Sequence, residues 1–223
     1  MNILSFEVST KPGHGQYRFL IQAAALFTWV TLVAVLGIFV LYPRIHATWT
    51  LTAAQVLLYF AMVLPILVWA RTIFQDFTSP LWQRLAALLL VAGSLIIAAV
   101  VHHYSIELVG VVIRVGVAAV SEELIFRGFI WDRMRRAGWS APLTIVVNTS
   151  AFALWHIPAM LTGLSQASVG RLAVLLLAGL ILCTLRQTTH SLTLPTAAHF
   201  AIDIFSAVAP VSRTVNGRDL VPS

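Results

Sequence analysis

Residues 121–128 have the sequence Ser-Glu-Glu-Leu-Ile-Phe-Arg-Gly and lie inside an apolar run that extends from Val117 to Ile130. Two adjacent carboxylates and a guanidinium are thus held in a segment hydrophobic enough to enter a membrane. A charged side chain near the centre of a bilayer costs roughly 2.5–3.5 kcal/mol on insertion scales. Charged residues in such segments usually face a protein interior or a water-filled cavity, so the cluster indicates a functional site.

The composition of the whole chain is that of a membrane protein. Of its 223 residues, 59% are hydrophobic and 10% are charged, and the mean hydropathy is +0.90. A soluble domain carries roughly 25% charged residues, which it needs to cover a surface that faces water. At this length we expect one integral-membrane domain over residues 1–223, without a separate soluble module.

Helices of roughly 20 residues cross a hydrocarbon core about 30 Å thick. By this criterion the predicted fold class is all-α, a polytopic transmembrane helix bundle of about seven spans. A polar leader, residues 1–17, precedes the first span, which is too long for a cleavable signal peptide, and a polar tail occupies residues 210–223. The expected spans are residues 18–42, 50–70, 82–102, 107–130, 141–157, 169–186 and 191–209.

The net charge of +6 comes mostly from arginines placed between apolar runs. Arginines placed in this way determine how the helices are oriented in the membrane and contact lipid headgroups. The distribution does not support binding of nucleic acid. With seven spans, eight basic residues flank the amino-terminal side and four flank the other, so we expect the N-terminus in the cytoplasm. The eight are Lys11, Arg18, Arg71, Arg84, Arg133, Arg135, Arg136 and Arg186, and the four are Arg44, Arg171, Arg213 and Arg218.

The spacing within the acidic cluster predicts different surroundings for its two carboxylates. On a helix, Glu123 and Arg127 are four residues apart and face one another, with the glutamate first, which is the better order for an ion pair. Glu122 lies about 100° around the helix from Glu123, so Arg127 cannot neutralise both equally. We therefore expect Arg127 to hold Glu123 while Glu122 projects into the bundle interior. The alternative is an ion-pair network that only fixes helices to one another.

Further polar residues interrupt the later spans. Phe152 and His156 are one helical turn apart, and His199 and Asp203 have the same spacing in an otherwise apolar helix. Two hydrogen-bonding groups aligned on one helix face within lipid favour a functional role over a structural one. Residues 148–150, Asn-Thr-Ser, are candidates for hydrogen bonding between helices.

These residue types suit hydrolysis of an amide without a nucleophilic serine or cysteine. A buried glutamate with a histidine can activate water as a general base, and a second histidine with a hydrogen-bonding neighbour can stabilise an oxyanion. Cys183 has no evident partner and no G-x-S-x-G motif occurs. Glutamate, histidine and aspartate are also competent zinc ligands, although the H-E-x-x-H pattern is absent.

Three motifs in order resemble the CPBP family of intramembrane proteases, which includes the CaaX prenyl endopeptidases and the Abi-type bacterial proteins. The resemblance covers Ser121 to Asp203, within the half of the chain from 107 to 209 that contains the motifs. Its motifs are E-E-x-x-x-R (Glu122, Glu123, Arg127), F-x-x-x-H (Phe152, His156) and H-x-x-x-[N/D] (His199, Asp203).

The resemblance implies a helix bundle that encloses a polar catalytic cavity. Glu122 would be the general base that activates water together with His156, and His199 and Asp203 would bind the developing oxyanion. It also implies a mechanism without a metal, and zinc bound through Glu122, His156 and His199 is the alternative. The implied supporting residues are Glu123, Arg127 and Phe152.

One residue departs from the family pattern, because Asp203 occupies a position often held by asparagine. An ionised aspartate beside an oxyanion would be unfavourable, so Asp203 would be protonated or would instead orient His199.

The substrate implied by the resemblance is a membrane-anchored or lipidated protein, cut at a peptide bond. The short length and the arginine-rich, lysine-poor composition suggest a prokaryotic origin, so the expected location is the inner membrane of a prokaryotic cell. Two other functions are compatible with the residues themselves. A proton-coupled transporter would use the same acids and imidazoles as a relay, although paired inverted repeats are not evident. A non-catalytic membrane scaffold or immunity protein would keep the fold without turnover.

Overall fold

Helices as long as a bilayer is thick make up most of the chain in the computed structural model, which describes residues 14–45, 47–69, 75–101, 106–162, 169–208, 214–215 and 218–219. The predicted all-α fold class is confirmed. The one exception in these ranges is a pair of two-residue antiparallel strands in the tail, β1 (Thr214–Val215) and β2 (Arg218–Asp219).

The helices differ in type as well as in length. Two segments are π-helical, η1 (Gly37–Leu41) and η4 (Leu124–Ile130), and η2 (Tyr42–Arg44) is a 3-10 turn. The α-helices are α1 (His14–Leu36), α2 (Thr48–Trp69), α3 (Leu81–Val101), α4 (Ile106–Glu123), α5 (Trp131–Arg136), α6 (Ala141–Trp155), α7 (Ile157–Leu161), α8 (Val169–Thr189) and α9 (Thr193–Val208).

Within the described ranges the segments join into seven rods that follow the seven expected spans. Here α1 continues through η1 and η2, α4 continues through η4 into α5, and α7 extends α6. Five rods are long and apolar enough to cross a membrane, Gly15–Arg44, Trp49–Trp69, Leu81–Val101, Ala141–Leu161 and Val169–Thr189. The other two are the charged α4–α5 rod and the 16-residue α9, so the count of seven spans stays a prediction.

The surface of helix α3 shows how the bundle meets lipid. Its buried positions are polar or small, Gln83, Ala87, Ser94 and Ala98, while both of its isoleucines and most of its leucines are exposed. Small and polar residues between helices, with large apolar ones outside, are the packing pattern of membrane proteins. Together with the apolar rods, this pattern identifies an integral membrane protein.

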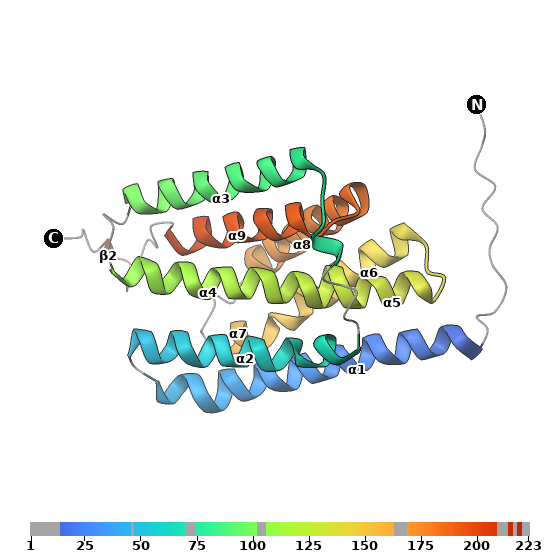
Figure 1. Cartoon of the computed structure of the whole chain (residues 1–223). Coiled ribbons are helices and arrows are strands. Elements are labelled where there is room, and N and C mark those ends of the chain that lie inside the picture. Colours follow the sequence, from blue (N-terminus) through green and yellow to red (C-terminus); the bar gives the residue numbers. More distant parts are fainter. Residues whose placement is uncertain are drawn as a thin grey trace.

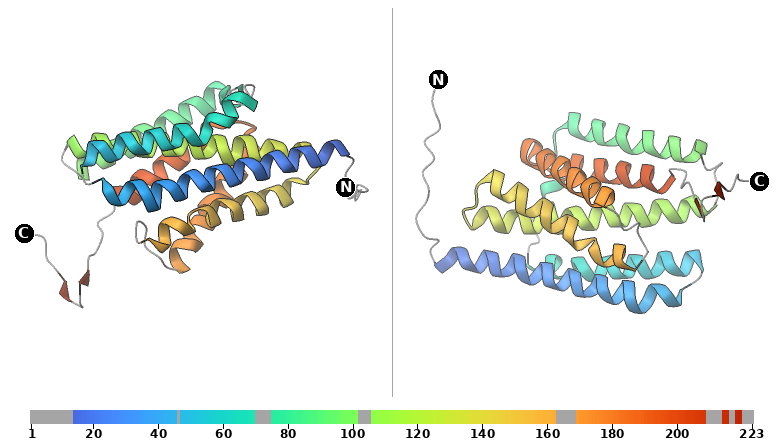
Figure 2. Two further views of the ribbon diagram at one scale, coloured as in Figure 1. Left: turned by 90° about the horizontal axis from the view of Figure 1, so that it is seen from below. Right: turned by 180° about the vertical axis from the view of Figure 1, so that it is seen from behind.

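The α4–α5 rod lies at the centre of the bundle (Figure 1). Helices α3 and α9 lie on one side of it and α1 and α2 on the other, while α6 and α8 pack on each other and cross behind it (Figure 2). Helix α4 packs directly against both α2 and α9. The residues of the central rod can therefore meet side chains from both layers.

The ends of α6 are set by residues that the sequence marks. Gly138 has a φ of +85°, a conformation that favours glycine. Ser140 is the N-cap residue, and its hydroxyl accepts a hydrogen bond from the amide of Leu143. At the other end Pro158 follows closely, and His156 is the C-cap residue. The end of α6 thus fixes where His156 lies.

Candidate active site

The site begins at a change of helix type within the central rod. Glu122 and Glu123 are the last residues of α4, and the π-helical segment η4 starts immediately after them. Every residue from 121 to 130 is buried. Short π-helical segments are rare and occur frequently at functional sites.

The expected ion pair between Glu123 and Arg127 is present. Arg127 Nη1 donates to Glu123 Oε1 at 2.9 Å, and both side chains are fully buried. The guanidinium also lies over the ring of Phe152, 4.3 Å from its centroid, and donates from Nη2 to the carbonyl of Gly179. This buried cation therefore has a carboxylate, a carbonyl and an aromatic face around it.

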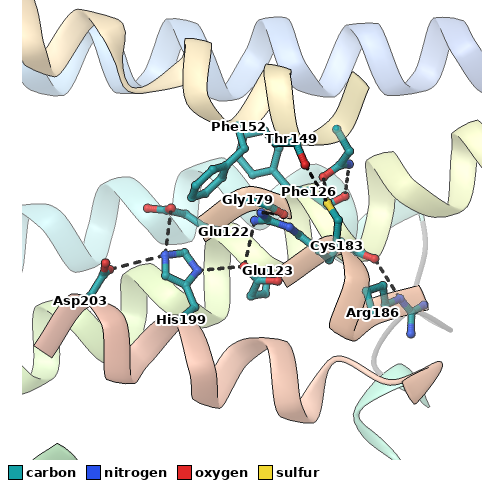
Figure 3. A network of polar contacts seen from close by, with 12 residues as sticks. Glu122, Glu123, Phe126, Thr149, Phe152, Gly179, Cys183, Arg186, His199 and Asp203 are labelled. Carbon is teal, nitrogen blue, oxygen red and sulfur yellow. Dashed lines mark hydrogen bonds and ion pairs between the residues drawn. The ribbon is translucent and has the colours of Figure 1, made fainter. Parts of the chain in front are cut away.

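His199 is held by the same carboxylate oxygen as Arg127 (Figure 3). Its Nδ1 lies 2.8 Å from Glu123 Oε1, and its Nε2 lies 3.6 Å from Glu122 Oε2 and 3.5 Å from Asp203 Oδ2. The sequence suggests Asp203 as the neighbour of His199, and the structure adds Glu123 on the opposite side of the ring. Helix α9 is thereby joined to α4 by a buried polar contact.

Glu122 projects into the interior, as its place on the helix predicts. Its Oε1 accepts a hydrogen bond of 2.6 Å from the hydroxyl of Tyr59 in α2. Its Oε2 is buried, has no hydrogen-bond partner among the described residues, and faces two imidazoles. One oxygen is thus occupied and the other is free for chemistry.

His156 presents one ring nitrogen to Glu122. Its Nδ1 lies 2.8 Å from the carbonyl oxygen of Phe152, and since a carbonyl only accepts, Nδ1 carries the proton. Nε2 lies 3.9 Å from Glu122 Oε2, too far for a direct hydrogen bond and suited to a shared water. The imidazole packs edge-on against the rings of Phe152 and Trp155.

A cavity of about 430 Å³ reaches the two residues from the side of α1 and α2. Its polar groups come from Glu122, His156, Tyr59, Tyr42 and Gln55, and the rest of its lining is apolar. The apolar lining residues are Ala34, Ile38, Ile45, Leu51, Leu58, Met62, Trp155 and Ala159. An apolar chain can therefore reach the free oxygen of Glu122.

Side chains from α6 and α8 bind the carbonyls of the π-helical segment. Asn148 donates to the carbonyl of Phe126 at 2.7 Å, which is the interhelical role suggested for residues 148–150. Arg186 donates from Nε to the carbonyl of Arg127 at 3.1 Å. The free cysteine Cys183 is buried beside Asn148 and donates to its side-chain oxygen at 3.4 Å. These contacts hold the backbone that follows Glu123.

Asp76, in the segment before α3, also binds Arg186. Arg186 pairs with its carboxylate, while the Asp76 carbonyl accepts hydrogen bonds from the amide of Leu192 and the hydroxyl of Ser191. Burial raises the pKa of the Asp76 carboxyl, and the Arg186 guanidinium acts in the opposite direction. The turn that leads into α9, and so to His199, is fixed by these bonds.

The expected residues that could hold a metal are Glu122, His156 and His199. Both imidazoles bond through Nδ1 and turn Nε2 toward Glu122 Oε2. In the described part of the chain, no group of three or more His, Cys, Asp or Glu is arranged to hold a metal ion.

The structure brings all seven predicted residues together, from Glu122 to Asp203, although they come from three rods. It also adds residues that sequence reasoning did not propose for the site. Tyr59 could have been noticed as a tyrosine midway along an apolar span, since tyrosines in membrane helices concentrate at the interfaces. Arg186 and Asp76 carry no comparable signal, because each resembles a charge that flanks a span.

Residues 104–205 match a family model described as Type II CAAX prenyl endopeptidase Rce1-like. No curated protein and no solved structure matches the chain. The matched segment contains every motif and every predicted site residue.

The description of the matched family is that of an endopeptidase, a class of enzyme that hydrolyses peptide bonds. The segment that carries the site is similar to the CPBP/CAAX protease family, as the sequence motifs predict. The match supports, in general terms, a CAAX-type intramembrane endopeptidase.

Proposed function

We propose that the chain is a metal-independent glutamate endopeptidase that cuts a peptide bond of a membrane-anchored or lipidated protein. The observation that carries the proposal is the free Oε2 of Glu122. It lies 3.9 Å from His156 Nε2 and 3.6 Å from His199 Nε2, and Glu122 lines a largely apolar cavity.

Glu122 and His156 together orient the attacking water. Both Glu122 Oε2 and His156 Nε2 are acceptors in this arrangement, so a water about 2.8 Å from each directs one hydrogen to each. Its oxygen lone pair then points toward the substrate carbonyl. As the oxygen attacks, one O–H bond breaks and Glu122 Oε2 takes the proton.

His199 and Asp203 stabilise the tetrahedral intermediate. His199 Nδ1 bonds to Glu123, and Nε2 faces the carboxyl groups of Glu122 and Asp203, so an imidazolium with a proton on each nitrogen satisfies these neighbours. Nε2–H then donates to the oxyanion, with a protonated Asp203 beside it. When the C–N bond breaks, the leaving amine takes the proton that Glu122 received.

The lining of the cavity supports a substrate with an apolar portion. The wall residues beyond Glu122, His156 and Tyr59 are mainly aliphatic or aromatic and come from α1, α2 and α6. A lipid chain or an apolar peptide segment would bury its surface there, which gains roughly 25 cal/mol per Å². The matched family is named for prenylated substrates, and that name supports a lipidated substrate for this chain.

We also propose a cytoplasmic N-terminus and a place in a prokaryotic inner membrane. The start of α1 and the end of α5 lie at one end of the bundle, and the end of α9 lies at the other (Figure 1). Arg18, Arg133, Arg135 and Arg136 thus belong to the same end. An excess of basic residues at one end is typical of the cytoplasmic side.

The test is cleavage of lipidated and unlipidated reporter peptides by purified protein in detergent or liposomes. Glu122→Gln removes the base and His156→Ala removes the second acceptor for water, and we expect each to lower kcat about 10²- to 10⁴-fold. Glu107→Gln is the matched control, because Glu107 is an exposed residue in the first turn of the same helix.

The comparison is valid only if the variants remain folded. Size-exclusion chromatography and thermal unfolding would establish that they do. Cleavage at the wild-type rate by both folded variants would overturn the assignment of Glu122 and His156. A loss in Glu107→Gln as large as that in Glu122→Gln would also count against it.

A further inference from the structure

Within the described residues, Tyr59 is the one residue of α2 that hydrogen bonds to the acidic pair, Glu122 and Glu123. Its hydroxyl donates to Glu122 Oε1 at 2.6 Å, and both residues are buried. No motif found in the sequence includes this tyrosine. Its position midway along a membrane helix means that its hydroxyl needs a partner inside the protein, and Glu122 is that partner.

The hydrogen bond makes the two oxygens of Glu122 unequal. Oε1 is occupied by Tyr59, whereas Oε2 has no hydrogen-bond partner in the described chain and faces His156 and His199. A carboxylate without this bond could rotate and exchange its oxygens. The bond therefore determines which oxygen meets the water.

We propose that Tyr59 is a positioning residue of the catalytic site, which holds Glu122 so that Oε2 receives the proton of the attacking water. This inference rests on the proposed function, because it assigns a role within the same hydrolytic step. It adds helix α2 to the elements that build the site.

The position of Tyr59 does not depend on its hydroxyl alone. Arg114 donates to the hydroxyl of Thr52 at 2.8 Å, a second polar contact between α4 and α2. The two contacts are seven residues apart in α2 and eight apart in α4, so they lie about two turns apart along the helices. Helix α2 therefore stays in register with α4 when one of them is removed.

The ring of Tyr59 has its own packing, separate from the hydroxyl contact. It belongs to the main apolar core with Leu58 and Met62, and the residue also lines the cavity. Phenylalanine at this position would keep the ring and the cavity wall while removing only the hydrogen bond. Tyr59→Phe is consequently a specific test of positioning.

The experiment compares Tyr59→Phe with Tyr17→Phe, a control with the same chemical change at an exposed tyrosine of α1 that does not line the cavity. Both full-length variants are assayed with the lipidated reporter peptide that the wild type cleaves. We expect Tyr59→Phe to lower kcat about 10- to 100-fold, the scale of a hydrogen bond to a charged group, with KM changed less than about threefold because the cavity wall is retained. Tyr17→Phe should keep the wild-type kcat.

An infrared measurement separates positioning from a general loss of structure. The carboxylate stretching band that disappears in Glu122→Gln should be shifted in Tyr59→Phe and unshifted in Tyr17→Phe. An unchanged kcat, an unshifted band, or an equal loss in both tyrosine variants would overturn the role of Tyr59.

The outcomes also distinguish this inference from the function on which it rests. If Glu122→Gln still cleaves the peptide, the proposed function fails. If Glu122→Gln is inactive while Tyr59→Phe is fully active, only the role of Tyr59 fails.

Discussion

His199 Nδ1 lies 2.8 Å from Glu123 Oε1, a contact between helices α9 and α4. It determines which ring nitrogen of His199 faces Glu122 and Asp203, because Nδ1 is already bonded. The second carboxylate of the acidic pair thus orients the imidazole, while the first remains available as a base. The two adjacent glutamates have different roles because their side chains point away from the helix in different directions.

Replacing Glu123 with glutamine should lower kcat about 10- to 100-fold, the scale of one hydrogen bond between charged groups. The amide keeps the shape of the side chain but removes the charge that supports a protonated His199. Steady-state kinetics on the reporter peptide would measure the effect, and KM should change little because Glu123 does not line the cavity. Wild-type kcat in a folded Glu123→Gln variant would contradict the role given to Glu123.

Replacing Arg127 with methionine should destabilise the protein by about 3–5 kcal/mol, since it leaves the charge of the buried Glu123 carboxylate compensated only in part, by His199. The double variant Glu123→Gln/Arg127→Met should recover part of this loss, because the uncompensated charge is gone. Unfolding in detergent, followed by circular dichroism, would give the free energies of unfolding. Equal stability of Arg127→Met and the double variant would show that the charge of Glu123 is not the cause.

Replacing Asp203 with asparagine should preserve cleavage within a few-fold of wild type, whereas Asp203→Ala should lower kcat about 10- to 100-fold. The asparagine amide donates a hydrogen bond at every pH, while aspartate donates only when protonated. The pH profile of kcat should therefore differ between the two proteins. The wild-type profile includes the titration of the Asp203 carboxyl, and the profile of Asp203→Asn does not. Equal inactivity of the two variants would show that the carboxyl group itself is required.

Much of the fold follows from the sequence because bilayer thickness limits the length of a helix. The apolar runs predict rods that the structure contains. The ends of α6 lie at residue types that commonly begin and end helices, the N-cap Ser140 and a proline, Pro158, just after the last turn. The π-helical segment was not predicted, since no residue pattern distinguishes it from α-helix before its partners are known. Its carbonyl contacts come from Asn148 and Arg186, on helices later in the chain.

The grouping of the site residues could also be predicted, because spacing by four aligns side chains on one helix face. Contacts across helices could not, since they depend on how each helix is rotated about its axis. The spacing predicts the pair Glu123 and Arg127 correctly, yet it cannot show that His199 shares the same oxygen. Tyr59 was missed for the same reason.

Gly179 allows α8 to approach the site closely, and enlarging it should destabilise the protein. A Cβ atom there would lie 3.1 Å from the Thr149 side chain and 3.4 Å from the Phe152 ring. Gly179→Val should lower the free energy of unfolding by about 1–3 kcal/mol, the usual effect of overpacking. Gly93→Ala is the control, because a Cβ atom there meets nothing within 4 Å, and its unfolding temperature should be unchanged or raised. A similar loss in both variants would argue against close packing as the cause.

Chelation should leave the activity of the purified protein unchanged, since the proposed mechanism draws its base, its acceptor and its oxyanion donor from side chains. The expected result is the same kcat before and after treatment with EDTA and with 1,10-phenanthroline, with elemental analysis to establish that zinc has been removed. The alternative site through Glu122, His156 and His199 would have Nε2 of both imidazoles as donors, since both Nδ1 atoms are bonded elsewhere. Loss of activity on chelation and recovery on adding zinc would support that alternative and overturn the metal-independent mechanism.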